Sequence, residues 1–204
     1  MKKRNLLLVL VMTVVLLVTG CGQEEKTNPF LGKWTGTLDY TEFFTSSMVA
    51  GNASIEEFVK FENLNFTFVF EFTEEKVSLH VDEASKHSFV ENVKTGVADM
   101  IDAMAANEAS KNGISVEAVY EKMGVTRDDY VAYTIENLDL DTMVSVMAEA
   151  LELNGSYEYD DEQIVVLYDD NTYESMKYAL GMEDLTITIS DGTNSFAIPC
   201  VKAQ

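Results

Sequence analysis

The sequence predicts an α+β protein: an antiparallel up-and-down β-barrel of about eight strands, with a helical insertion between the third and fourth strands. Three observations lead to this fold class. Apolar and polar residues alternate with period two before residue 84 and after residue 154. Between those positions the apolar residues recur with helical spacing. Tight turns join neighbouring strands wherever no helix intervenes, as in an up-and-down barrel, and a β-sandwich or half-open sheet is the alternative.

The first strand is expected at Gly32–Tyr40. Its apolar face carries Trp34, Gly36, Leu38 and Tyr40, and polar residues alternate with them, which is typical of a half-buried strand. Trp34 is the single tryptophan of the chain. Residues 41–63 are expected to form short helices, in which Asn52 or Ser54 caps a turn that holds Ile55, Phe58, Val59 and Phe61.

A β-hairpin with one aromatic face follows. Its first strand places Leu64, Phe66, Phe68, Phe70 and Phe72 on one side. Residues 73–76 form the turn, and Val77, Leu79 and Val81 continue the apolar face on the second strand. Each buried phenylalanine removes about 150–250 Å² from water, so the four rings either fill a core or line a ligand cavity.

Four helices are expected between residues 84 and 154. The first carries a stripe from Phe89 to Met104 and ends at Asn112-Gly113. The second begins after Ser115 and stops at Gly124. The third begins at Thr126-Arg127-Asp128-Asp129, which resembles a capping box with Asp in place of Glu. The last begins at Asp139 or Asp141 and is expected to end at Asn154-Gly155. The methionines of this helical segment either pack in a core or form an adaptable binding face.

Five strands are expected after the helices. The segments 156–159 and 164–168 flank the turn 160–163, and 173–180 is a further strand. The strand 185–190 turns at Asp191-Gly192 into the last strand, which contains Phe196, Ile198 and Cys200. Pro199 lacks a backbone donor, so the last strand is expected to lie at an edge or a bulge there.

The N-terminus has the pattern of a secretory signal: a basic start at residues 2–4, an apolar run at 6–18, and Thr19-Gly20 before Cys21. The apolar run has 13 residues, whereas a spanning helix needs about 20. The sequence Val18-Thr19-Gly20-Cys21 resembles the lipobox of bacterial lipoproteins, although Val stands where Leu is usual. The resemblance implies that Cys21 receives a diacylglyceryl group and becomes the first residue of the mature chain. An ordinary cleaved signal is the alternative.

The expected organisation is therefore a signal peptide at residues 1–20, a lipidated tether at 21–29 and a β domain at 30–204 with the insertion at 84–154. Two acyl chains anchor a protein because each buried methylene contributes about 0.8 kcal/mol. We expect the protein at the cell membrane, on its extracytoplasmic face, with the membrane as a partner through the anchor alone. If Cys21 is a thioether, Cys200 has no internal disulfide partner.

The charge of the chain argues against anionic partners. Loss of residues 1–20 removes three basic residues and leaves 11 basic and 35 acidic ones, a formal charge of −24. Such a charge argues against nucleic acid and against docking on anionic headgroups. It is compatible with a cationic partner, with loosely held divalent cations or with a solvated acidic exterior.

Several features together resemble bacterial (Clostridia-type) lipoproteins with a lipocalin-like (calycin) domain. They are the lipobox, the Gly32-x-Trp34 opening with Asp39, a Phe-rich hairpin that ends in Val81-Asp82-Glu83, a helical block and a terminal Leu-Thr-Ile-Thr strand. In calycin barrels the tryptophan plugs the closed end. The resemblance implies binding of small, often apolar ligands, and the matching positions are scaffold positions.

The sequence offers no catalytic residue, metal ligand or cofactor site. No Gly-x-Ser-x-Gly motif is present, and His80 and His87 lack the spacing of a zinc site. Asp139-Leu140-Asp141 and Asp169-Asp170-Asn171 lack the glycine and terminal glutamate of an EF-hand loop. Paired carboxylates for glycoside hydrolysis cannot be singled out. We therefore expect a protein that is not an enzyme.

Two binding functions remain, of which we expect the first and keep the second as the alternative. In the first, the barrel holds a small apolar ligand in a cavity lined by Phe66, Phe68, Phe70, Phe72 and Tyr157, with the helices as a lid. In the second, the protein is an interaction or inhibitor module of the cell envelope. The second hypothesis predicts a filled barrel and an exposed apolar patch on the helices.

Overall fold

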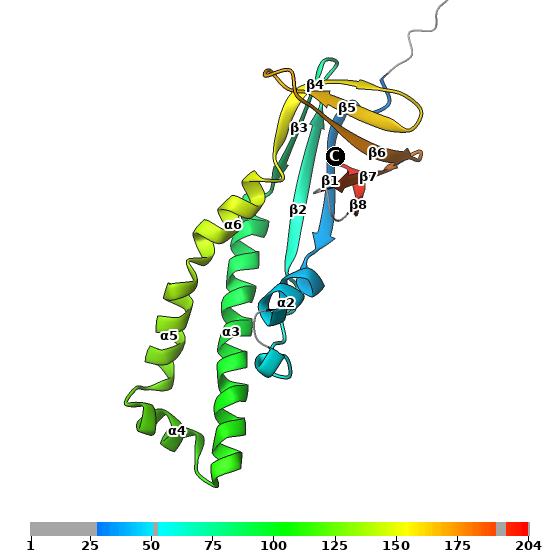
Figure 1. The fold of residues 1–204 in the computed structure, drawn as a ribbon. Helices are drawn as coiled ribbons and strands as arrows, with labels where there is room; N and C mark the ends of the chain where they lie inside the picture. The colour runs from blue at the N-terminus through cyan, green and yellow to red at the C-terminus, as the bar shows by residue number, and fades with distance from the viewer. Residues whose placement is uncertain (1–27, 51–52, 191–194, 204) are drawn as a thin grey trace, which may run out of the picture. The chain divides into compact units, whose positions relative to one another are not determined.

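The computed structural model describes residues 28–50, 53–190 and 195–203 (Figure 1). The predicted signal peptide, Cys21 and most of the predicted tether lie outside these residues. The chain divides between Phe30 and Leu31, and the fold described below is that of the unit from Leu31 to Gln204.

Eight antiparallel strands form a closed barrel in which each strand pairs with its neighbours in sequence and the last returns to the first. This confirms the predicted antiparallel barrel over the sandwich and the half-open sheet. The period-two segments identified in the sequence provide the strands. They are β1 (Gly32–Asp39), β2 (Asn65–Phe72), β3 (Lys76–Val81), β4 (Leu153–Tyr159), β5 (Gln163–Leu167), β6 (Tyr173–Leu180), β7 (Asp184–Ser190) and β8 (Ser195–Lys202).

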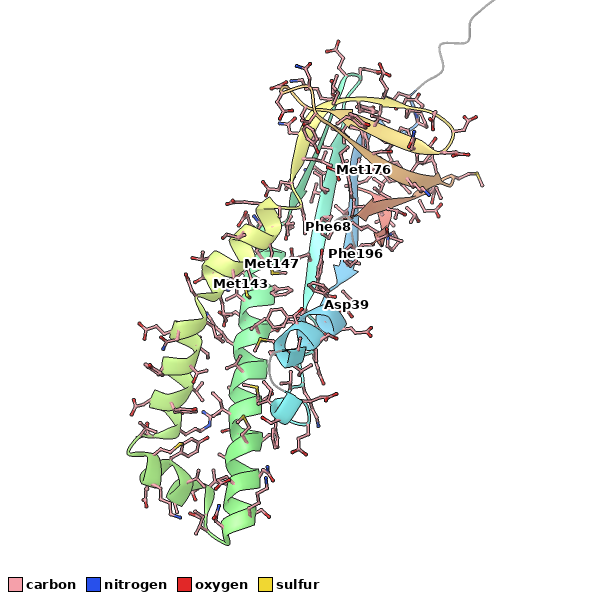
Figure 2. The ribbon with its side chains drawn as sticks, in the orientation of Figure 1. Asp39, Phe68, Met143, Met147, Met176 and Phe196 are labelled. Atoms are coloured by element: carbon pink, nitrogen blue, oxygen red, sulfur yellow. The ribbon has the colours of Figure 1, made fainter. Side chains whose placement is uncertain are left out.

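The interior of the barrel is filled by apolar side chains from all eight strands. The registers place Phe70 of β2 opposite Trp34 of β1 and Leu79 of β3, so that one parity of each strand faces inward. Phe68 and Met176, from β2 and β6, are both fully buried (Figure 2). The buried residues of this interior are Trp34, Phe66, Phe68, Phe70, Phe72, Val77, Leu79, Val81, Leu153, Ile164, Val166, Met176, Leu185, Ile187, Ile189, Ile198 and Cys200.

The barrel closes at a short seam between β1 and β8. The two strands pair over three positions, from Trp34 opposite Lys202 to Gly36 opposite Cys200. A Cβ atom on Gly36 would lie 2.6 Å from Ile198 Cγ2 and 2.7 Å from Cys200 Sγ, so glycine is what allows the strands to approach. Although β8 is not an edge strand in the closed barrel, among the described residues the register gives Pro199 a partner in β7 and none in β1, so the proline lies just beyond the seam.

Helices occupy the chain between β3 and β4. They are α3 (Glu83–Asn112), α4 (Val116–Met123), α5 (Arg127–Leu138) and α6 (Leu140–Glu149). In Figure 1, α5 and α6 run back along α3, with α4 at the far end. The name helical insertion is used below for residues 83–152.

The predicted caps Ser115 and Thr126 and the predicted stops Gly113 and Gly124 are confirmed, and Asp82 is a further cap that was not predicted from the sequence. The Asp82 carboxylate accepts from Ser85 N at the start of α3, and Gly113 ends that helix with a φ of +63°. Ser115 and Thr126 cap α4 and α5 through their hydroxyl oxygens. Short polar side chains satisfy the backbone N–H groups of a first turn, which have no partner within the helix.

An aromatic cluster joins the helical insertion to the barrel. The rings of Phe66 in β2 and Phe89 in α3 stack with centroids 4.5 Å apart. Tyr40 contacts Phe66 at 5.3 Å, and Phe44 contacts Phe89 at 5.7 Å. Phe44 belongs to α2 (Thr41–Ala50), a helix within the segment expected to be helical. The η1 turn (Ala53–Ile55) and an irregular stretch complete that segment.

The predicted end of the last helix is wrong. Asn154-Gly155 does not stop α6, which ends at Glu149, but lies inside β4 opposite Ser78 and Val77 of β3. A Cβ atom on Gly155 would lie 2.5 Å from Leu167 O of β5, so this glycine serves close strand packing. A glycine at a helix end and a glycine in a crowded strand look alike in sequence.

Candidate binding groove on the helical insertion

The five residues predicted to line a cavity are packed along the barrel, four on β2 and Tyr157 on β4. The side chains of Phe66, Phe68 and Phe70 are fully buried and Phe72 is 2% exposed. Tyr157 of β4 is half-buried; its ring meets Phe72 edge-on at 5.4 Å, and its hydroxyl donates to Thr73 O at 2.9 Å. The three cavities considered below are lined by other residues. The phenylalanines therefore contribute apolar packing to the barrel, the first of the two roles that the sequence left open.

A small cavity of about 70 Å³ lies between strand residues and the end of the helical insertion. Leu79, Ile189 and Phe196 line it with residues 150–153, and Glu174 supplies a carboxylate. Tyr168 Oη donates to Glu174 Oε2 at 2.7 Å, and burial together with this bond raises the pKa of Tyr168. A volume of 70 Å³ suits about two water molecules, whereas drug-sized ligands need roughly 300 Å³ or more.

A larger apolar groove, of about 410 Å³, lies on the helical insertion. We call it the methionine groove. Its lining comes from α3, α4 and α5 and from the stretch that holds η1. The lining residues are Ile55, Phe58, Met100, Ile101, Met104, Ala105, Asn107, Glu108, Val119, Tyr120, Met123, Tyr130 and Thr134.

Helical periodicity explains how the methionine groove is built. Met100, Met104 and Glu108 follow one another at intervals of four residues along α3, so they lie on one face. The same face continues the apolar stripe that buries Phe89 and Val93 nearer the barrel. Beside the groove, α3 still buries Ile101, Ala105 and Ala109, whereas Met104 of α3 is 39%, Met123 of α4 48% and Tyr130 of α5 38% exposed. Large apolar side chains that stay exposed together are typical of interaction sites.

An ion pair holds α5 against α3 beside the methionine groove. Arg127 Nε donates to Asp102 Oδ1 at 2.8 Å, and Nη2 donates to Asp102 Oδ2 at 2.7 Å. The guanidinium lowers the pKa of Asp102, and burial with the nearby Asp102 charge raises the pKa of Tyr120. No residue of α5 is buried, so this two-point contact is a main attachment of the helix. Because 25 residues separate the two partners, no local pattern in the sequence indicates the pair.

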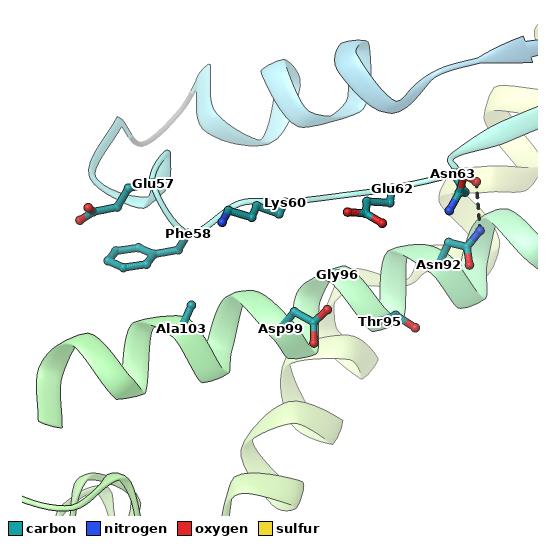
Figure 3. A pocket seen from close by; sticks show the side chains of 10 residues that line it. All are labelled: Glu57, Phe58, Lys60, Glu62, Asn63, Asn92, Thr95, Gly96, Asp99 and Ala103. Atoms are coloured by element: carbon teal, nitrogen blue, oxygen red, sulfur yellow. Dashed lines mark hydrogen bonds between the residues drawn. The ribbon is translucent and has the colours of Figure 1, made fainter. Parts of the chain in front are cut away.

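A polar cavity of about 350 Å³ borders the methionine groove (Figure 3). It lies between α3 and the stretch of residues 57–63, and Phe58 lines both cavities. Glu57, Glu62 and Asp99 bring three carboxylates to its lining, and Lys60 brings one ammonium group. Asn92 Nδ2 donates to Asn63 O at 3.0 Å and closes one end. The cavity is therefore net acidic.

The remaining candidate residues make ordinary surface or packing contacts. His80 and His87 are exposed, and the Asp170 carboxylate accepts from Thr172 N and Oγ1 in a turn. In the part of the chain that the structure describes, no group of three or more His, Cys, Asp or Glu side chains is placed to hold a metal ion. Among the same residues, no helix has the length and apolar character needed to cross a membrane. Cys200 is buried, and its burial raises the thiol pKa to about 12.

Comparison with protein-family models, with curated proteins and with solved structures gave no match. The function of the protein is therefore inferred from its own residues and geometry.

Proposed function

We propose that this protein is a lipid-anchored, extracytoplasmic interaction module that binds another polypeptide through the methionine groove. In this proposal Cys21 carries a diacylglyceryl group, and the barrel is a packed scaffold of the lipocalin-like type. The helical insertion between β3 and β4 presents the binding surface. Support for the anchor comes from the basic start, the apolar run and the Val18-Thr19-Gly20-Cys21 sequence.

The observation that carries the proposal is the contrast between a filled barrel and an open apolar groove. The aromatic face of β2 is 0–2% exposed, whereas the groove keeps Met104 and Met123 39% and 48% exposed. Methionine side chains are flexible and polarisable, so they adapt to the shape of a partner. Tyr130, at the same groove, adds an amphipathic ring of the kind enriched in protein interfaces.

Support for a lipocalin-like barrel is the up-and-down order of eight strands and the position of Trp34 on β1. Trp34 is 2% exposed, and Lys202 Nζ lies 5.3 Å from the centre of its ring.

Photo-crosslinking in membranes of the host tests the binding site. A photoreactive amino acid at position 104 is expected to give a discrete polypeptide adduct, identified by mass spectrometry. The matched control is position 146, because Val146 is 59% exposed on α6 and does not line the groove. Equal adduct patterns at both positions, or no polypeptide adduct at position 104, would contradict the proposed function.

Detergent phase partition tests the anchor separately. Cys21→Ser is expected to move the protein from the detergent phase to the aqueous phase, because two acyl chains supply the membrane affinity. Cys200→Ser is the matched control and is expected to leave the protein in the detergent phase. An unchanged distribution of the Cys21→Ser protein would refute the lipid anchor.

A small apolar ligand in the same groove is the second candidate function. The groove volume of about 410 Å³ lies within the range of small-molecule sites, roughly 300–1,000 Å³. Native mass spectrometry of protein purified from its own host distinguishes this candidate. A lipid or metabolite that co-purifies with the wild type and is lost in Met104→Lys would support it.

A further inference from the structure

The charges around the methionine groove restrict what the partner can be. Residues 83–152 contain 14 acidic and 5 basic residues, a formal charge of −9. Among the thirteen described residues that line the groove, Glu108 is the one carboxylate, and no lysine or arginine belongs to the lining. The groove is thus an apolar surface within an acidic helical insertion.

The polar cavity next to the groove concentrates this negative charge. Asp99 on α3 directly precedes Met100, so the acidic cavity and the methionine groove occupy adjacent faces of the same helix. Phe58 stands in the wall of both. Glu57 and Glu62 lie across from α3 on the other side of the cavity (Figure 3), and Lys60 offsets one of the three carboxylates.

We propose that the polypeptide bound in the methionine groove is a cationic amphipathic segment, an inference that rests on the proposed function. Its apolar side chains enter between Met100, Met104 and Met123, and its lysine or arginine side chains meet the carboxylates of the polar cavity. A segment of this kind presents apolar anchors on one face and charges on the other, as amphipathic helices do when they occupy grooves.

The energetics favour this chemistry over an acidic or neutral segment. The apolar contacts provide affinity by removing methionine and tyrosine surface from water. Carboxylates that face the bound segment favour cations and repel an acidic segment of equal apolar area. Since these carboxylates are accessible to solvent, added salt screens them within a Debye length of about 10 Å at 0.1 M.

Binding of designed peptides to the chain from Gly22 onward, which contains the whole Leu31–Gln204 unit, tests the inference. The probes are a fluorescent leucine–lysine peptide with one apolar helical face, its leucine–glutamate counterpart, and a scrambled leucine–lysine peptide of the same composition. Fluorescence anisotropy is expected to show binding of the first at least about tenfold tighter than of the other two. The affinity is expected to fall as salt is added.

Variants locate the binding site. Met104→Lys is expected to weaken binding of the leucine–lysine peptide about tenfold or more, because it places a cation in the groove at an accessible position. Val146→Lys makes the same change of net charge on α6 and is expected to have little effect. Asp99→Asn is expected to weaken binding several-fold, and Glu149→Asn on α6 is its control. Circular dichroism checks that each variant is folded.

The outcomes separate the two proposals. Equal binding of the ordered and scrambled peptides, or equal weakening by Met104→Lys and Val146→Lys, overturns the cationic segment in favour of diffuse charge attraction. Absence of peptide binding together with a polypeptide adduct at position 104 overturns the cationic segment and leaves the proposed function standing. Absence of both overturns both proposals.

Discussion

The stacked pair of Phe66 and Phe89 offers a quantitative test of how the helical insertion is attached to the barrel. Both side chains are fully buried, and their rings stack at 4.5 Å with an interplanar angle of 17°. Phe66 also contacts Tyr40, and Phe89 also contacts Phe44. Phe66→Leu and Phe89→Leu therefore each remove two aromatic pairs.

The expected magnitudes follow from these contacts. An aromatic pair contributes about 0.5–1.5 kcal/mol beyond its buried area, so each single variant is expected to lose about 1–3 kcal/mol of the free energy of unfolding. The double variant loses three pairs rather than four, because the stack is common to both. We therefore expect its loss to fall short of the sum of the single losses by about 0.5–1.5 kcal/mol.

Urea unfolding followed by two probes measures these quantities. Fluorescence of the single tryptophan, Trp34, reports on the barrel, and far-ultraviolet circular dichroism is dominated by the helices. If the aromatic cluster couples the two parts, the two transitions coincide in the wild type. Losses of Phe66→Leu and Phe89→Leu that add to within about 0.3 kcal/mol would refute the coupling. Phe66→Leu with Val119→Ala on α4 is the control pair and is expected to be additive.

Three further predictions concern the seam, the ion pair and the buried thiol. Gly36→Ala is expected to lower the free energy of unfolding by about 1–3 kcal/mol, measured by urea unfolding, because its methyl group overlaps β8; an unchanged stability would contradict the close approach. Arg127→Gln is expected to speed amide hydrogen exchange in α5. Arg127 lowers the folded-state pKa of Asp102, so the ion pair stabilises the fold above the unfolded pKa of about 3.9. This stabilisation is lost as pH falls through the lower folded pKa, so the exchange protection of α5 in wild type and variant is expected to become equal in acid. If the exchange protection of α5 still differs between the two proteins at the lowest pH, the ion pair with Asp102 is not what stabilises α5. Cys200, whose thiol pKa burial raises to about 12, is expected to resist a thiol reagent in the native chain from Gly22 onward and to react in urea; rapid native labelling would show that β8 opens.

Much of the fold could be predicted from the sequence because its signals are local. Alternation in Phe66–Phe72 and Val77–Val81 identifies a hairpin, since strand side chains point to opposite faces in turn. Ser115, Gly113 and Gly124 mark helix ends because backbone groups at those ends need a cap or a positive φ. These requirements hold whatever surrounds the element.

The candidate site could be predicted only in part. The methionine content of the helices indicated either core or binding face, and α3 contains both kinds of position: Phe89, Val93 and Ile101 are buried, whereas Met104 is 39% exposed. Which part is covered depends on where α4, α5 and residues 55–58 lie against α3. That arrangement involves contacts between distant segments and leaves no periodic pattern in the sequence.

By itself, the sequence determined the alternating strands, the capped helices, the acidic charge and the lipobox-like start, because each depends on neighbouring residues or on composition. Tertiary structure decided the rest. Closure of β8 onto β1 beside Gly36, the place of Gly155 inside a strand and the pairing of Arg127 with Asp102 all depend on atoms brought together from far along the chain. The filled barrel and the open methionine groove have the same origin, since burial is set by what packs against a side chain and not by the side chain alone.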